Sequence, residues 1–247
     1  MQTTIYNEIS DYFPEFVKPD WYEQLCLNLK SNVHPTYGLV IYNFIIHNDW
    51  IDHVVDIGTA EGFSAICAIK GFEDIQRKGS IHTVDIVDRS YSGSATRINF
   101  DKYTNYENYD INVQFITGDS KKVIKTIPQS PDLVFHDGHH EYISVSSEIQ
   151  QIESKNIGKT VHIFDDYHMY DYQHLLKLYP NQLGDIISKI PLVGNILSGD
   201  TRVNEVWIVN KRYPGVIEAI HEAAMKYDAD LEVIEDRYRA PATILKI

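Results

Sequence analysis

The chain has 247 residues, 43% of them hydrophobic and 23% charged, which favours one folded α/β unit with an appendage and argues against disorder. Lys and Arg number 22 against 35 Asp and Glu, so the formal net charge is -13. Such a surface repels a phosphate backbone, and the densest basic stretches are pairs such as Lys121-Lys122, so we expect no nucleic-acid partner.

The N-terminal segment shows no targeting or membrane signal. Residues 1–20 have neither the basic region nor the apolar region of a secretory signal. The most apolar stretch, Leu39–Ile46, is far shorter than the roughly 18 residues that a spanning helix needs. The two cysteines, Cys26 and Cys67, are typical of buried free thiols in a reducing compartment. We therefore expect a cytoplasmic protein without a membrane partner.

The predicted elements divide the chain near residue 50. Residues 1–50 predict helices at Trp21–Leu29 and Tyr37–Ile46, which would form a cap on the substrate side. Residues 51–247 predict the main domain, in which short strands alternate with helices, as in a parallel sheet covered on both faces. The expected strands are His53–Ile57, Ser80–Ile86, Val113–Thr117, Asp132–His136 and Thr160–Phe164. The expected helices are Phe63–Gly71, Ser94–Tyr103, Lys121–Ile127 and Tyr142–Lys155.

The last third of the chain is less regular. It predicts a strand at Val206–Val209, a helix opened by proline at Pro214–Tyr227 and a terminal strand at Thr243–Ile247. The apolar segment Tyr179–Asn204 has no clear period. A lid, the wall of a substrate pocket, a contact in a homo-oligomer and an ordinary packed insertion would each fit it.

The turn after the first expected strand of the main domain predicts a ligand site. The segment Val54–Ser64 runs from an apolar strand through D-x-G-x-x-x-G directly into a helix, where glycines allow a tight turn and close approach of a ligand. The dinucleotide pattern G-x-G-x-x-G fails at Ala60 and Phe63, and Glu61 would place a carboxylate beside a pyrophosphate. NAD and FAD are therefore disfavoured, whereas S-adenosylmethionine, which has no phosphate, carries no such penalty.

Acidic residues follow three successive expected strands, at the sheet edge where open sheets bind ligands. Asp56 would meet the methionine ammonium of S-adenosylmethionine, and Ser64 its carboxylate. Asp85 would accept from both ribose hydroxyls and Asp119 from the adenine amino group. Each acid alone is explained by a helix cap, but three at one edge indicate a cofactor site. The expected cofactor-binding residues are Asp56, Gly58, Thr59, Gly62, Ser64, Asp85, Asp119 and Ser120.

Five motifs in fixed order carry a resemblance to a known family. They are D-I-G-T-A-E-G-F-S, V-D-I, G-D-S, D-L-V-F-H-D-G-H-H-E-Y and H-I-F-D-D-Y-H. Together they resemble class I S-adenosylmethionine-dependent methyltransferases, and most closely the small-molecule O-methyltransferases related to catechol and macrolide-sugar methyltransferases. The resemblance covers Tyr37 to the C-terminus. It implies a Rossmann-like fold, α/β with seven mostly parallel strands, helices on both faces and an antiparallel C-terminal strand, but it does not name the acceptor.

Carboxylates also follow the fourth and fifth expected strands, at Asp137, Asp165 and Asp166. Neighbouring strand ends lie about 5 Å apart, and three unpaired carboxylates so close demand a cation or a raised pKa. Oxygen ligands suit Mg²⁺ or Ca²⁺. The resembled metal-dependent branch holds Mg²⁺ with acids at positions that match these three. The alternatives are helix caps with loop ion pairs, and a mixed His/Asp site for Zn²⁺ or Fe²⁺.

Histidines beside these acids are the candidate bases. We expect His139 to remove the proton of an acceptor hydroxyl, with His140 and Asp137 as the next candidates; the other roles for His139 are stacking on adenine or capping the turn. His136 and His168 are expected to be structural. The predicted reaction is methyl transfer to a hydroxyl of a small molecule, such as a sugar, a catechol-like compound or a natural-product diol, with Mg²⁺ assisting. The alternatives are metal-independent transfer to an amine or carboxylate, and a non-catalytic protein that binds S-adenosylmethionine or another metabolite.

Overall fold

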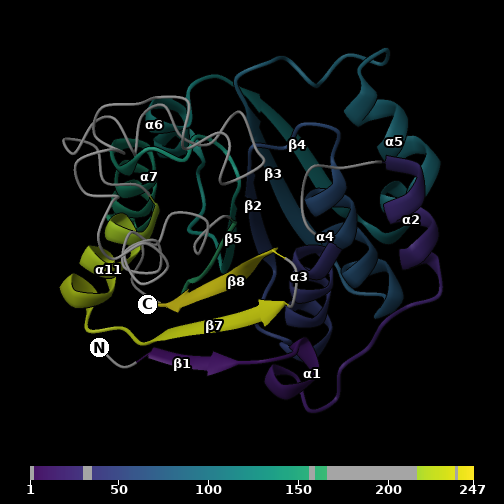
Figure 1. The fold of residues 1–247 in the computed structure, drawn as a ribbon. Coiled ribbons are helices and arrows are strands. Elements are labelled where there is room, and N and C mark those ends of the chain that lie inside the picture. Colours follow the sequence, from purple (N-terminus) through teal and green to yellow (C-terminus); the bar gives the residue numbers. More distant parts are fainter. Residues whose placement is uncertain (1–2, 30–34, 156–158, 166–215, 237–238) are drawn as a thin grey trace, which may run out of the picture.

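The computed structural model describes residues 3–29, 35–155, 159–165, 216–236 and 239–247, and one sheet of eight strands runs through it (Figure 1). The strand order is β1-β7-β8-β6-β5-β2-β3-β4. Strand β8 is antiparallel to both of its neighbours, and every other pair is parallel. The strands are β1 Thr3–Tyr6, β2 His53–Ile57, β3 Gly79–Asp85, β4 Ile111–Thr117, β5 Leu133–His136, β6 Val161–Phe164, β7 Leu231–Asp236 and β8 Arg239–Lys246.

The predicted topology of seven mostly parallel strands with an antiparallel C-terminal strand is present as β2–β8. The five strands predicted between residues 53 and 164 are confirmed as β2–β6. Two strands were not predicted, β7 and the edge strand β1, which lies where the sequence indicated only helices. The predicted strand Val206–Val209 and the segment Tyr179–Asn204 lie outside the described residues.

Helices cover both faces of the sheet, so the molecule has three layers (Figure 1). The helices α2, α3, α4 and α5 lie on one side, and α6, α7 and α11 on the other. Within the described ranges, every helix is too short or too polar to cross a membrane. The helices are α1 Ile9–Tyr12, α2 Trp21–Leu29, α3 Pro35–His47, α4 Phe63–Asp74, α5 Ala95–Tyr103, α6 Ser120–Val123, α7 Tyr142–Glu153 and α11 Val216–Tyr227, with 3-10 turns at Tyr106–Tyr109 and Ile124–Thr126.

The N-terminal helices share the main core. Helix α3 is apolar around nearly its whole circumference, which allows it to be buried from Tyr37 to Ile45 and to pack along α4. Tyr37 and Ile66 belong to the same buried cluster as Ile81 of the sheet. The segment before residue 50 is therefore held by the same apolar contacts as the rest of this layer.

Strand alternation divides the side chains of the sheet between the two layers. Leu133 and Phe135 of β5 belong to the cluster on the α4 side, whereas Val134 belongs to the cluster on the other side, together with Ile152 of α7. The carboxyl ends of β2 to β6 meet at one edge because these strands are parallel. Any ligand at this edge would contact the turns that leave these strands.

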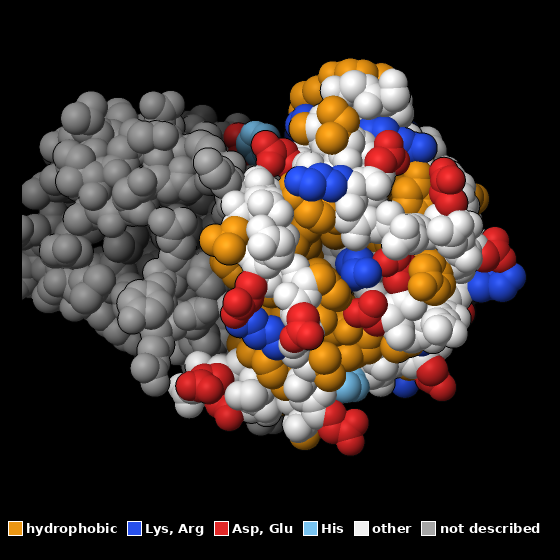
Figure 2. Space-filling model, turned by 90° about the vertical axis from the view of Figure 1, so that its right-hand side faces the viewer, with side chains coloured by type: hydrophobic (Ala, Val, Ile, Leu, Met, Phe, Trp, Pro, Cys, Tyr) orange, Lys and Arg blue, Asp and Glu red, His pale blue; other side chains and the backbone are white. Residues whose placement is uncertain are grey.

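The surface on the side of α2 and α5 carries charges of both signs, interspersed with apolar side chains (Figure 2). No continuous basic patch is visible on this face of the described residues. The acidic excess of the chain is thus spread rather than gathered at one point of this face.

Candidate functional site

The turn between β2 and α4 is built around two glycines in left-handed conformations. Gly58 has φ +89°, and a Cβ added there would lie 2.0 Å from the carbonyl oxygen of Asp137. Its N–H donates to the carbonyl of Val84 at 2.8 Å. Gly62 has φ +93° and a Cβ there would lie 2.5 Å from the Phe100 ring. The D-x-G-x-x-x-G pattern therefore lets the ends of β2, β3 and β5 approach one another closely.

Asp56 lies beneath this turn as a buried carboxylate. Its side chain is 1% exposed, and Oδ1 accepts a hydrogen bond from the Ser64 hydroxyl at 2.6 Å. The other oxygen, Oδ2, has no hydrogen-bond partner among the described residues. Burial raises the pKa of Asp56 to about 6, against the lowering effects of the Ser64 and Thr59 side chains. A donor or cation arriving at this edge would satisfy an oxygen that is otherwise buried at a cost.

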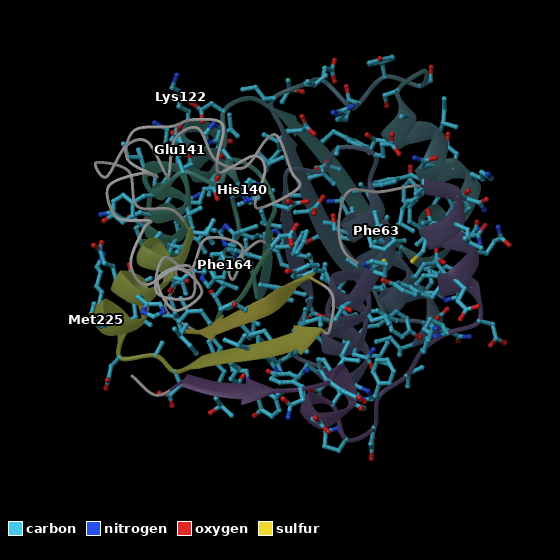
Figure 3. All side chains as sticks on the ribbon, viewed as in Figure 1. Phe63, Lys122, His140, Glu141, Phe164 and Met225 are labelled. Atoms are coloured by element: carbon cyan, nitrogen blue, oxygen red, sulfur yellow. The ribbon has the colours of Figure 1, made fainter. Side chains whose placement is uncertain are left out.

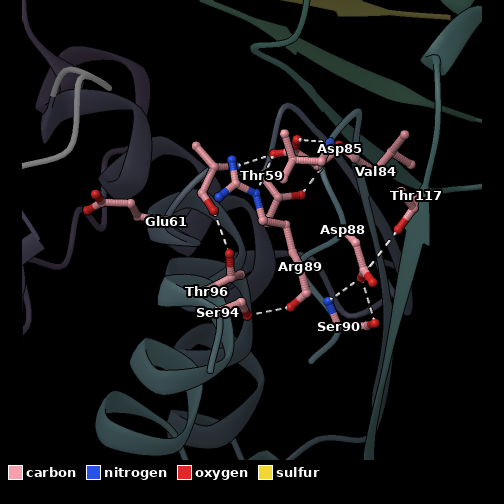
Figure 4. Close-up of polar contacts among 12 residues, drawn as sticks. Thr59, Glu61, Val84, Asp85, Asp88, Arg89, Ser90, Ser94, Thr96 and Thr117 are labelled. Carbon is pink, nitrogen blue, oxygen red and sulfur yellow. Dashed lines mark hydrogen bonds and ion pairs between the residues drawn. The ribbon is translucent and has the colours of Figure 1, made fainter. Parts of the chain in front are cut away.

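Asp85 connects the glycine turn to the loop that follows β3 (Figure 4). Its Oδ2 accepts from the Ala60 N–H at 2.8 Å and from Arg89 Nε at 3.2 Å, and its Oδ1 accepts from the Val87 N–H at 2.8 Å. The Thr96 hydroxyl donates to the Ala60 carbonyl and fixes the other side of the turn. Asp85, which the sequence predicts to bind a ribose, thus holds the glycine turn and the loop after β3 together.

The third predicted acid, Asp119, caps α6 and accepts from the Lys121 N–H at 3.1 Å. Capping a helix is the alternative role that the sequence allowed for this acid, beside binding adenine. Ser120, next to it, donates to Glu148 Oε1 at 2.5 Å. Thr59 is 2% exposed, so it contributes to the packing of the turn rather than to its surface.

The predicted metal ligands Asp137 and Asp165 come directly after residues that are paired in the sheet. His136 of β5 is in register with Phe164 of β6, and the Asp165 N–H donates to the His136 carbonyl at 3.1 Å. The Asp137 side chain is 18% exposed and Asp165 is 7% exposed. Asp166 lies outside the described residues, and no cluster of three metal-ligating side chains occurs among those that are described. Carboxylates at two neighbouring strand ends supply part of the oxygen donor set that a hard cation requires.

The two candidate histidines differ in their surroundings. His140 Nε2 lies 3.7 Å from Asp137 Oδ1 and its side chain is 32% exposed. The His139 side chain is 62% exposed, and its Nδ1 lies 3.9 Å from Glu141 Oε2. In Figure 3, His140 and Glu141 lie on the α7 side of the sheet, whereas Phe63 lies on the α4 side. The structure thus brings His140, and not His139, to the Asp137 carboxylate.

Sequence reasoning missed two residues that shape this edge, Arg89 and Glu148. Arg89 pairs with Asp85, and its position four residues after that acid gave no signal of its own. Glu148 is 1% exposed, and burial raises its pKa to about 7. The sequence does indicate that Glu148 is unusual, because it is an acidic residue on the apolar face of α7, beside Val145, Ile149 and Ile152.

Comparison with known proteins agrees with the fold of this chain. Residues 55–167 match the family described as a methyltransferase domain, and no curated protein sequence matches the chain. The S-adenosylhomocysteine-bound methyltransferase PaMTH1 of Podospora anserina is similar in structure, with a TM-score of 0.58 and 16% identity, over 96% of this chain and 92% of that one.

Two further solved structures are similar over most of this chain. The O-methyltransferase TomG of Streptomyces achromogenes, involved in tomaymycin synthesis and solved with S-adenosylmethionine, has a TM-score of 0.56 and 14% identity, over 98% of this chain and 96% of that one. The methyltransferase MycE of the mycinamycin biosynthetic pathway, solved with Mg and S-adenosylhomocysteine, has a TM-score of 0.50 and 15% identity, over 94% of this chain and 55% of that one. At these identities the likeness concerns the fold.

Proposed function

We propose that this chain methylates a hydroxyl of a small molecule, with Mg²⁺ assisting. Its residues 55–167 match a methyltransferase domain, and its fold is that of class I S-adenosylmethionine-dependent methyltransferases. The observation that carries the proposal is the buried Asp56 carboxylate, whose Oδ2 has no partner among the described residues beneath a glycine turn. A cytoplasmic location and the absence of nucleic-acid and membrane partners stay predictions from composition.

The cofactor would lie across the carboxyl ends of β2, β3 and β4. Asp56 Oδ2 would receive the methionine ammonium, directly or through water, and the glycine turn would let the cofactor approach the backbone. Asp85 would receive the ribose hydroxyls on the lone pairs that Ala60, Val87 and Arg89 leave available. Asp119 and Ser120 would border the adenine.

Asp137, Asp165 and Asp166 would hold Mg²⁺, a proposal that the oxygen-only donor set supports. When bound, the ion would lower the pKa of a substrate hydroxyl and favour a chelating diol. MycE, which shares the fold, was solved with Mg, and this supports the proposal by analogy.

The hydroxyl proton needs an acceptor near the Asp137 carboxylate. Of the three candidates predicted from the sequence, His140 has the better geometry, because its Nε2 faces Asp137 Oδ1 while His139 points towards Glu141. We therefore place His140 ahead of His139 as the general base, with Asp137 orienting the imidazole.

The test is transfer of a labelled methyl group from S-adenosylmethionine to a panel of catechol and sugar diols, with Mg²⁺ or with EDTA. We expect product only with Mg²⁺, and an Asp165→Asn variant that binds cofactor but loses about 10²-fold or more of the rate. Asp52→Asn is the matched control, since Asp52 lies at the other end of β2 with its side chain 70% exposed. Product that is insensitive to EDTA and to Asp165→Asn would support the metal-independent alternative. Cofactor binding without transfer to any acceptor would support the non-catalytic one.

A further inference from the structure

Four side chains outside the proposed site form a continuous buried chain on the α7 side of the sheet. Glu148 Oε2 lies 3.0 Å from His136 Nδ1, and His136 Nε2 lies 3.0 Å from His162 Nδ1. The other ring nitrogen of His162 lies 2.9 Å from Glu153 Oε1. All four side chains are at most 4% exposed, and the two rings stack on Phe164. The chain thus crosses from α7 to β5, then to β6, and back to α7.

A row of buried polar side chains such as this contributes little to stability, so its geometry indicates another role. Placing two carboxyl groups and two imidazoles in an apolar layer costs desolvation free energy, which hydrogen bonds at best offset. Apolar side chains of similar volume are often as stable at such positions. What they cannot supply is a fixed distance between particular backbone segments.

Glu148 makes contacts that differ from those of the other members. Its Oε1 accepts from Ser120, in the turn after β4, while its Oε2 contacts His136, the last residue of β5. A Cβ added to Gly138 would lie 3.8 Å from Glu148 Oε1, so the carboxyl group also lies beneath the turn that carries Asp137 and His140. One side chain on a helix therefore bridges the turns after β4 and β5, two strands that β2 and β3 separate in the sheet.

We propose that Glu148 is a positioning residue that sets the separation between the turn after β4 and the turn after β5. Through Ser120 it would hold Asp119 on the adenine side, and through His136 it would hold Asp137 and His140 on the acceptor side. The inference rests on the proposed function, since these turns matter only if the cofactor and acceptor lie between them. Positioning of this kind depends on the length of the side chain rather than on its charge.

Length and charge can be separated by two substitutions at this position. Glu148→Gln keeps the length and an acceptor for Ser120, and its amide nitrogen can donate to His136 Nδ1, but it cannot ionise. Glu148→Asp keeps the charge but is one methylene shorter, so it cannot reach both turns. Glu153 provides the matched control, because it ends the same chain, is 4% exposed and contacts His162 rather than a strand-end turn.

The experiment is calorimetric titration of S-adenosylhomocysteine, with and without Mg²⁺, into the full chain and its Glu148→Gln, Glu148→Asp, Glu153→Gln and Glu153→Asp variants, each with a melting temperature. We expect Glu148→Asp to weaken binding about tenfold or more and the other three variants to stay within about threefold of the unmodified chain. Both aspartate variants should lower the melting temperature similarly, because each opens a similar cavity.

Three outcomes would overturn the inference. One is full affinity in Glu148→Asp, another is weaker binding in Glu148→Gln than in Glu148→Asp, and the third is an equal loss in Glu153→Asp. If the unmodified chain itself fails to bind S-adenosylhomocysteine, the proposed function fails first, which distinguishes that result from the other three.

Discussion

Asp56 accepts a hydrogen bond from Ser64 on one oxygen, while its other oxygen is buried without a partner among the described residues. Burial raises the pKa of this carboxyl from 3.8 to about 6, and the nearby Asp85 charge acts in the same direction. A raised folded-state pKa stabilises the fold below about pH 4, and this contribution is lost as the pH rises through 6. At neutral pH the ligand-free protein therefore holds a carboxylate that destabilises it.

The first prediction is that Asp56→Asn stabilises the ligand-free protein at pH 8 and not at pH 4. We expect the free energy of unfolding to rise by about 1–2 kcal/mol at pH 8. This is less than the ~3 kcal/mol that corresponds to a pKa shift of about two units, because the new amide lacks a partner. Urea unfolding at both pH values measures the difference, and titration of S-adenosylmethionine should show weaker binding. Asp52→Asn, at an exposed position, is the control. A gain that is equal at both pH values would contradict the argument.

The turn between β2 and α4 requires a glycine at position 58. Its φ of +89° disfavours any side chain, and a Cβ would lie 2.0 Å from the Asp137 carbonyl oxygen. Because the clash is with backbone, it cannot be relieved by rotating a side chain. Replacing this glycine would therefore push the turns after β2 and β5 apart.

The second prediction is that Gly58→Ala lowers the free energy of unfolding by about 3 kcal/mol or more and abolishes cofactor binding. Gly93→Ala is the matched control, because its Cβ would meet only the Tyr91 ring at 3.4 Å, an ordinary contact. Urea unfolding and calorimetric titration of S-adenosylhomocysteine measure both effects. If the two variants behave alike, close approach of the turns is not what this glycine provides.

At the scale of elements, the sequence predicted the parallel part of the sheet because strands β2, β3, β5 and β6 are apolar runs separated by clear helical segments. It did not predict β7, in which Glu232, Glu235 and Asp236 interrupt the apolar pattern. It also missed β1, a four-residue edge strand whose pairing with β7 bridges more than 220 residues of sequence. Pairing at such separation is set by tertiary contacts, and local propensity does not report it.

The candidate site was likewise predicted where it depends on local sequence and missed where it depends on tertiary contacts. The sequence predicted that Asp85, Asp137 and Asp165 share one edge of the sheet, and the structure places them there because the strands that they end or follow are parallel. The partners of those acids were not predicted, because Ser64 reaches Asp56 from a helix and Arg89 reaches Asp85 from a loop. Their contacts depend on how the layers pack, which one sequence does not reveal.

The third prediction concerns β1 as an element. Deletion of residues 1–7 removes a strand that β7 and β8 separate from β6, the nearest strand of the proposed site. We expect the free energy of unfolding to fall by about 1–3 kcal/mol while the affinity for S-adenosylhomocysteine stays within about twofold. The bared edge of β7 should also increase association in size-exclusion chromatography, because unpaired strand edges recruit partners. A large loss of affinity would show that the N-terminal segment supports the site.

At the scale of the whole molecule, the residues that would bind the cofactor lie at the carboxyl ends of β2, β3 and β4, which stand side by side in the sheet. The charge of Asp85 raises the pKa of Asp56, so these acidic groups repel one another in the ligand-free state. A ligand that binds only the folded chain adds its binding free energy to stability. Asp85 is where this linkage can be tested, since it joins the turn after β2 to the loop after β3.

The fourth prediction is that S-adenosylhomocysteine at 100 times its dissociation constant stabilises the chain by about 2.7 kcal/mol, which corresponds to a rise in melting temperature of roughly 5–10 °C for a protein of this size. Asp85→Asn should lose more than half of this shift at the same ligand concentration, because it disturbs the contacts to Ala60, Val87 and Arg89. Asp88→Asn is the control, since the Asp88 carboxylate mainly holds Ser90 in its own loop. Thermal unfolding with and without ligand measures the shift, and an equal shift in both variants would remove Asp85 from the cofactor site.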